Sequence, residues 1–294
     1  MEKRILVPLD GSNTAEMVLP YATEIAARTR SEVIITSVHE LETHDVDRLF
    51  STYLNKIAEE VRASLSKYGA LEPKIWTRLL EGKAANEIVQ CADEEKVGLI
   101  ALASRGASGE GPWLLGSIAA KVLRATDKPV LLIRTPASEK AIEERRLLKK
   151  ILVPLDGSEW GEAAVPMVLE FSGLLQCEVT LFQAIRPVSP WAGDAPLVIP
   201  QDIEHRRSSS AAYLLNVEKR FKDKAINVNS VVVTGVPADT IIDYAKTNSI
   251  DLIAMSTHGR SGVDRWVFGS ITDKVLHAGD TAVLTVRPPA RPAR

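Results

Sequence analysis

RILVPLDGS occupies Arg4–Ser12, and KILVPLDGS, which differs only in its first residue, occupies Lys150–Ser158. The apolar run in each stretch is typical of a buried strand, and the Asp-Gly-Ser after it is typical of a tight turn. The two stretches are 146 positions apart, so the chain contains an internal repeat. We therefore interpret the chain as one structural unit that occurs twice.

Later landmarks support the repeat and locate an insertion. Gly106 returns as Gly259, and Gly116 returns as Gly269, both 153 positions on. The second copy therefore has seven more residues between the two sets of landmarks. We expect them in the stretch 186–200, because its proline and glycine content is typical of a loop.

Each copy alternates apolar strands with amphipathic helices, which indicates right-handed βαβ units. The strands are almost continuously apolar, so they suit a parallel sheet with both faces covered. In the first copy we expect strands near 4–9, 32–38, 74–80, 99–103 and 130–134, and helices near 13–29, 47–68, 84–96 and 117–125. In the second copy we expect strands near 151–155, 178–184, 227–234, 251–256 and 281–286.

The predicted fold class is therefore α/β, with two doubly wound domains at 1–135 and 150–288. The stretch 136–149 between them is highly charged, and we interpret it as a solvated linker with a short helix near 139–148.

Composition excludes several classes of function. The chain has 294 residues, is 45% hydrophobic and carries a net charge of −2, so no strong basic field favours nucleic acid or an acidic membrane. No apolar run reaches the roughly 18 residues that span a bilayer, and the first residues lack a signal-peptide core, so we expect a cytoplasmic protein without a membrane partner. Cys91 and Cys177 match no metal-binding spacing and are expected to be reduced thiols.

The carboxyl edge of such a sheet is where ligands bind. At this edge, Gly116–Ser117 and Gly269–Ser270 each precede a predicted helix. The first N–H groups of a helix lack partners and favour a phosphate. Alternatively, the serines are ordinary helix caps and the glycines only form turns.

Asp10 and Asp156 end the first strand of each copy, at the same edge of the sheet. Either carboxylate could accept hydrogen bonds from ribose hydroxyls, or it could instead stabilise the Asp-Gly-Ser turn. The sequence leaves both interpretations open.

Each copy has the same order of motifs: V-P-x-D-G-S, then a strand, a glycine loop, nine residues and G-S. In this order the chain resembles the universal stress protein family, with two such domains in tandem over nearly the whole chain. The resemblance implies a Rossmann-like, adenine nucleotide alpha hydrolase-like fold, with a five-stranded parallel sheet of order 3-2-1-4-5 in each domain. It also implies that ATP, with or without Mg²⁺, binds at the motif G-x-x-G-(nine residues)-G-(S/T).

Carried onto this chain, the motif identifies candidate nucleotide-binding residues in both copies. Those of the second copy are Pro154, Asp156, Ala184, Met255, Ser256, His258, Gly259, Arg260, Gly269, Ser270 and Ile271. Those of the first copy are Pro8, Asp10, Val38, Leu102, Ala103, Gly106, Gly116, Ser117 and Ile118. Ser256 and Ala103 replace the first glycine of the motif, so we expect strand-like backbone there.

The two glycine loops differ in charge. The second reads RSGVDRWVF after Gly259 and includes Arg260 and Arg265, whereas the first reads ASGEGPWLL and has no basic residue. Because ATP is a polyanion, we expect tighter binding in the C-terminal domain.

The leading functional hypothesis is an ATP-binding stress-response sensor or signalling module. One alternative is an interaction protein without nucleotide, whose edge strands near 130–134 and 281–286 pair into an intrachain pseudo-dimer or a homodimer. Another is a slow ATPase. We assign no catalytic and no metal-binding residue, because the chain has no Walker lysine, nucleophile elbow or metal motif.

Overall fold

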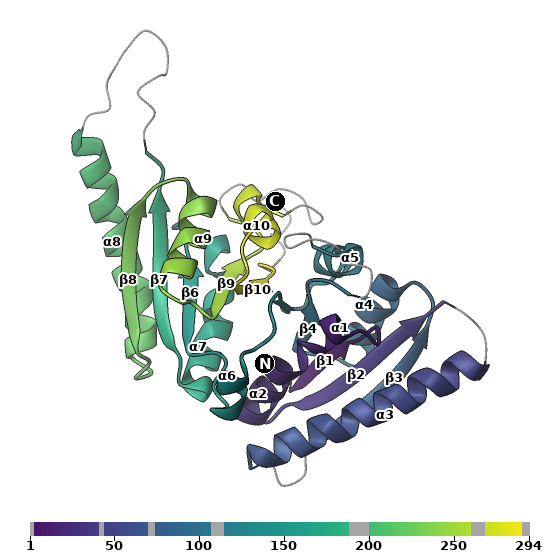
Figure 1. The fold of residues 1–294 in the computed structure, drawn as a ribbon. Helices are drawn as coiled ribbons and strands as arrows, with labels where there is room; N and C mark the ends of the chain where they lie inside the picture. Colours follow the sequence, from purple (N-terminus) through teal and green to yellow (C-terminus); the bar gives the residue numbers. More distant parts are fainter. Residues whose placement is uncertain are drawn as a thin grey trace. The chain divides into compact units, whose positions relative to one another are not determined.

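The computed structural model describes residues 3–40, 44–69, 74–106, 115–187, 200–259 and 268–289 (Figure 1). The described residues form two compact units, and each is treated separately. The first unit runs to Leu148 and includes Asp280–Arg287; the second contains residues 149–259, 268–279 and 288–289.

The sheet of the first unit is parallel. Its strands, in spatial order, are β3 (Ile75–Glu81), β2 (Glu32–His39), β1 (Arg4–Pro8), β4 (Leu99–Ala103) and β5 (Val130–Ile133). β10 (Ala282–Val286), which belongs to this unit, pairs antiparallel with β5, with Val283 opposite Leu132.

The second unit repeats the arrangement. Its strands, in spatial order, are β9 (Leu252–Ser256), β6 (Lys150–Pro154), β7 (Glu178–Ile185) and β8 (Val228–Thr234), all parallel. The register of β6 with β9, Ile151 opposite Leu252, corresponds to that of β1 with β4, Ile5 opposite Leu99.

Helices cover both faces of each sheet. In the first unit, α2 (Leu19–Thr29) and α3 (His44–Lys67) pack together, as do α4 (Ala84–Glu94) and α5 (Ser117–Ala125) (Figure 1). In the second, α9 (Pro237–Thr247) packs with α10 (Ser270–His277), and α8 (Pro200–Lys222) packs on β7 and β8. The predicted class of doubly wound α/β units is confirmed.

Burial explains the apolar strands. All five residues of β4 and all five of β9 are buried, because helices lie on both faces of these central strands. Full burial of one Leu or Ile side chain contributes about 1.5–3 kcal/mol. These strands therefore hold the carboxyl edge, where the candidate site lies, on a rigid core.

The helix predicted near 13–29 is two helices. α1 (Asn13–Glu16) ends before α2 begins, and Pro20 lies in the first turn of α2. The second copy has a short 3₁₀ helix, η1 (Trp160–Ala164), followed by α7 (Val165–Leu175), with Pro166 in its first turn. Proline has no N–H and its ring clashes with the carbonyl four residues earlier, so a continuous helix is excluded. The prediction of one helix was wrong.

The prediction of a solvated linker was also partly wrong. α6 (Glu139–Glu143) is exposed and ends five residues earlier than predicted. Leu147 and Leu148 are buried, and the Leu147 N–H donates to the buried Glu24 carboxylate at 2.6 Å. The end of the linker is therefore held against the first unit.

Two equivalent tyrosines locate the insertion. The Tyr53 hydroxyl donates to Glu16, and the Tyr213 hydroxyl donates to Glu162, each at 2.9 Å. Burial, and then the bonded carboxylate, raises the pKa of both tyrosines. The distance along the chain between equivalent positions of the two copies changes twice. It is 146 residues for Glu16 and Glu162, 160 for Tyr53 and Tyr213, and 153 for the starts of β3 and β8. The second copy therefore gains 14 residues before Tyr213 and loses seven before β8, rather than gaining seven once.

Candidate functional site

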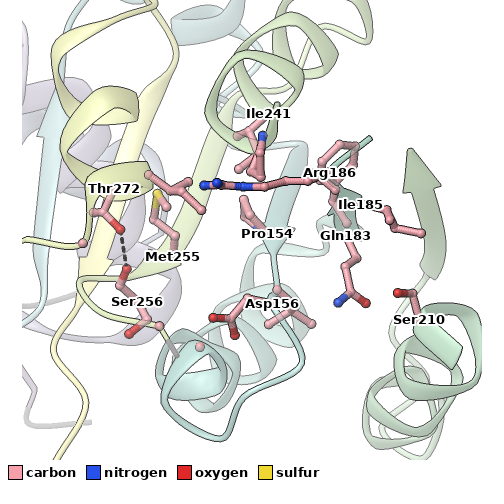
Figure 2. Close-up of a pocket in the computed structure, with 18 of the residues that line it drawn as sticks. Pro154, Asp156, Gln183, Ile185, Arg186, Ser210, Ile241, Met255, Ser256 and Thr272 are labelled. Atoms are coloured by element: carbon pink, nitrogen blue, oxygen red, sulfur yellow. Dashed lines mark hydrogen bonds between the residues drawn. The ribbon is translucent and has the colours of Figure 1, made fainter. Parts of the chain in front are cut away.

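A cavity of about 570 Å³ opens at the carboxyl ends of β6, β7 and β9 in the second unit (Figure 2). Ligands of doubly wound sheets bind at this edge, and small-molecule sites commonly occupy about 300–1,000 Å³. Figure 2 shows Asp156 between Ser256 on one side and Gln183 on the other. The cavity is therefore large enough for a nucleotide and crosses the end of β6.

The sequence-derived candidates of the second copy line this cavity, apart from Arg260, which lies outside the described residues. The lining candidates are Pro154, Asp156, Ala184, Met255, Ser256, His258, Gly259, Gly269, Ser270 and Ile271.

The first unit has a smaller cavity, of about 140 Å³, at the corresponding edge. All candidates of the first copy line it: Pro8, Asp10, Val38, Leu102, Ala103, Gly106, Gly116, Ser117 and Ile118. The fold thus brings together residues that are more than 100 positions apart in each copy.

Each strand-end aspartate stabilises its turn. The Asp156 Oδ1 accepts from the Ser158 N–H at 3.0 Å and from its hydroxyl at 2.6 Å. The Asp10 Oδ1 accepts the equivalent bonds from Ser12, at 3.1 and 2.5 Å. The intervening Gly157 has φ of 81°, which favours glycine. The turn-forming role is therefore present in both copies, and any contact with ribose would be additional.

The loop glycines pack against these aspartates. A Cβ at Gly259 would lie 2.3 Å from Asp156 Oδ2, and a Cβ at Gly106 would lie 2.1 Å from Asp10 Oδ2. A side chain at either position would therefore displace the neighbouring carboxylate, which favours glycine there independently of a ligand. The first residue of each loop, Gly106 or Gly259, therefore lies next to the carboxylate that lines the cavity.

The starts of α5 and α10 bring backbone N–H groups to the edge of each cavity. Gly116 and Gly269 are the N-cap residues, and Ser117 and Ser270 are the first helical residues. Each N-cap residue is a glycine and has no side chain that could cap its helix. The alternative that the serines are ordinary caps is therefore wrong, and the first turn of each helix can donate to an anion.

Hydrogen bonds order the beginning of the second glycine loop. The Ser256 hydroxyl donates to the His258 carbonyl at 2.7 Å, and the Thr272 hydroxyl donates to the Ser256 carbonyl at 2.9 Å (Figure 2). His258 Nδ1 lies 2.9 Å from the Thr257 hydroxyl. Neither Ser256 nor Ala103 has positive φ, so the expected strand-like backbone at the motif's first position is confirmed.

Several lining residues were missed by sequence reasoning. They lie at the end of β7 and on α8 and α9: Gln183, Ile185, Arg186, Arg206, Ser209, Ser210, Pro237 and Ile241. The sequence offered one signal for these residues, since Glu40 in the first copy is replaced by the basic Arg186 in the second. The α8 residues could not be found in this way, because the insertion before Tyr213 hides their register.

The donor set suits a ligand with phosphate groups and an apolar part. Amides at the start of α10 and the Ser270 hydroxyl can hold phosphate oxygens, while Pro154, Ala184 and Met255 supply apolar walls. Within the part of the chain that the structure describes, no group of three or more His, Cys, Asp or Glu side chains could hold a metal ion. Each described helix is also too short or too polar to serve as a membrane span.

Comparison with known proteins identifies the class. The model of the universal stress protein family matches residues 1–134 and again 148–287. The chain therefore belongs to the universal stress protein family, with two such domains in tandem.

Individual relatives agree with this assignment. Universal stress protein MJ0531 of Methanocaldococcus jannaschii is 27% identical over 148 residues, covering 49% of this chain and 85% of the relative. MJ0577 of the same organism is 28% identical over 155 residues, covering 48% and 96%. A crystal structure of a universal stress protein from Archaeoglobus fulgidus has a TM-score of 0.70 at 20% identity, covering 98% of this chain and 99% of that one, which shows the shared fold.

Proposed function

We propose that this protein binds ATP, chiefly in the second unit, and acts as a stress-response sensor or signalling module in the cytoplasm. The observation that carries the proposal is the cavity of about 570 Å³, which combines apolar walls with the uncapped start of α10. The corresponding cavity of the first unit is about 140 Å³. A larger ligand is therefore expected to prefer the second unit.

Roles can be proposed for the lining residues. The amides of Ser270 and Ile271 hold the phosphates, with Mg²⁺ or without it, since the helix start carries partial positive charge. Asp156 accepts hydrogen bonds from the ribose hydroxyls through Oδ2, while its Oδ1 accepts the bonds from Ser158 that form the turn. We further propose the domain boundaries 1–135 and 150–288, with 136–149 as the linker.

The test places a negative charge at each helix start. Ser270→Asp repels a phosphate while stabilising the N-terminus of α10, so the fold is expected to survive. Isothermal titration of the full chain should show that Ser270→Asp weakens ATP binding by about tenfold or more, which corresponds to about 1.4 kcal/mol. Ser117→Asp, the matched change in the first unit, should have a small effect. A larger loss with Ser117→Asp would contradict the proposed preference.

A second candidate function is self-association, because β10 pairs antiparallel with β5 over Val130–Leu132, so these strands, predicted as edges, can join. We propose that strands 130–134 and 281–286 form an intrachain pseudo-dimer, which a second chain extends to a homodimer. Sedimentation analysis with and without ATP tests this candidate. Sustained phosphate release that Asp156→Ala abolishes would instead support a slow ATPase.

A further inference from the structure

The two cavities share most of their lining, and the second has an additional compartment. Every described residue that lines the first cavity, except Ser104, has its counterpart in the lining of the second. Six residues of the second cavity have no counterpart in the first: Gln183, Ile185, Arg186, Arg206, Ser209 and Ser210. We call these six residues the α8 compartment.

The first unit fills the corresponding space with side chains. The equivalence of Tyr53 and Tyr213 makes Phe50 the counterpart of Ser210. His39 lies 3.1 Å from Asp47, and its ring stacks with that of Phe50 at 6.1 Å between centroids. In the second unit, Ile185 and Ser210 replace His39 and Phe50, which leaves the compartment open.

Gln183 lines this compartment, and the oxygen of its side-chain amide is unpaired among the described residues. Its side chain is 7% exposed, and its Oε1 atom is buried without a hydrogen-bond partner among the described residues. Its counterpart, Ser37, donates its hydroxyl to the Leu9 carbonyl at 2.8 Å. Because a buried unpaired acceptor is costly, Gln183 has the character of a group that awaits a donor from a ligand.

The position of Gln183 indicates which part of a nucleotide would supply that donor. The start of α10, where phosphates are expected, lies beside Ser256 and Thr272, whereas Gln183 and Ser210 lie across Asp156 from them (Figure 2). A nucleotide has its phosphates at one end and its base at the other, with the sugar between. With the phosphates at α10 and the sugar at Asp156, the base extends toward Gln183.

We propose that Gln183 is the residue of the second site that selects adenine. This inference rests on the proposed ATP binding. A carboxamide matches the edge of adenine, because Oε1 accepts from the exocyclic amine while Nε2 donates to a ring nitrogen. Along the N7 edge, a base with a carbonyl in place of the amine presents two acceptors, so no orientation of the carboxamide pairs with both. Ser37 cannot make this pair, so the first unit lacks the selection.

The experiment compares ATP with inosine triphosphate (ITP), which has a carbonyl where adenine has its amine. It uses the full chain carrying Ser117→Asp, so that the second site dominates the titration. Without further change, ATP should bind at least about fivefold more tightly than ITP, the lower end for a paired amide contact. Gln183→Met, which keeps length but removes both polar atoms, should reduce this ratio to less than about twofold. Gln183→Asn, whose amide is one carbon shorter, should reduce it too and is available if Gln183→Met does not fold.

Other outcomes overturn the inference in distinguishable ways. An unchanged ratio in Gln183→Met and Gln183→Asn means that the amide does not read the base. If mutation of Gln183 weakens the binding of ATP and of ITP equally, the amide contacts the sugar or the phosphates instead of the base. Equal binding of both nucleotides before mutation of Gln183 refutes only the selection of adenine. If neither ATP nor ITP binds, both the proposed function and the selection of adenine are refuted. Ser37→Ala is the matched control and should leave the ratio unchanged.

Discussion

The end of β2 in the first unit and the end of β7 in the second carry different side chains. In the first unit, His39 contacts Asp47 and Phe50 and fills the space beside α3. In the second, Ile185 and Ser210 leave it open, and the cavity is about 570 Å³ instead of about 140 Å³. The strand registers, the Asp-Gly-Ser turns and the uncapped helix starts are the same. Different side chains at one strand end and on the helix beside it thus accompany different cavities in two copies of one fold.

The largest difference in stability is expected at a pair of equivalent glutamates. Glu24 is 1% exposed and accepts the Leu147 N–H, whereas its counterpart Glu170 is exposed. Glu24→Ala should lower the free energy of unfolding by about 2–3 kcal/mol, because it leaves a buried N–H unpaired. Glu170→Ala should change it by less than about 0.5 kcal/mol. Urea unfolding measures both, and equal effects would show that the linker contact is unimportant.

Closing the α8 compartment should make the second site resemble the first. Ser210→Phe restores the residue type found at Phe50 and is expected to weaken ATP binding about tenfold, or about 1.4 kcal/mol, by filling the cavity. Ser210→Ala, which removes only the hydroxyl, should retain most of the affinity. Titration calorimetry compares the two variants. ATP binding unaffected by Ser210→Phe would place the nucleotide away from α8.

The loop glycines should behave alike in both units. Gly106→Ala and Gly259→Ala each bring a Cβ within about 2.3 Å of an aspartate oxygen that the turn restrains, and should cost about 1–2 kcal/mol. Gly173→Ala is the control, because no atom lies within 4 Å of the added Cβ and the first copy has Ala27 there. This change should stabilise α7 by about 0.5–1 kcal/mol. Thermal unfolding without nucleotide measures the stability of all three variants. If alanine is tolerated at Gly106 but not at Gly259, or the reverse, the two loops are not equivalent.

The smallest expected effect is a pH dependence in the first unit. Burial, together with the charge of Glu95, raises the pKa of Cys91 from 9.0 to about 11. The folded state therefore binds this proton more tightly, and the stabilisation it provides is present below pH 9 and is lost as pH rises toward 11. Between pH 7.5 and 9.5 the loss should be about 0.8 kcal/mol. Urea unfolding of Cys91→Ala over this pH range should lack this component, and an unchanged pH dependence in the variant would contradict the assignment to Cys91.

Much of the fold could be predicted because its signals are local. α5 has the predicted bounds, Ser117–Ala125, since a Gly-Ser start is followed by a periodic apolar face. The break before Pro20 was also readable, but the apolar pattern continues across it and favoured one helix. The docking of Leu147 on Glu24 joins positions 123 apart, which no local pattern reports. The lining residues that belong to the repeated motifs were predicted. Those on α8 were missed, because an insertion in the second copy shifts the alignment of α8 with α3.

By itself, the sequence determined the repeat, the parallel strands and the positions where glycine, serine and aspartate meet at a sheet edge, since periodicity and turn chemistry depend on neighbours along the chain. Only the tertiary structure decided that Gly259 packs against Asp156, that Ser117 and Ser270 do not cap their helices, and that the buried Gln183 oxygen has no hydrogen-bond partner among the described residues. These properties depend on distances between elements that are far apart in the chain, and packing alone sets those distances.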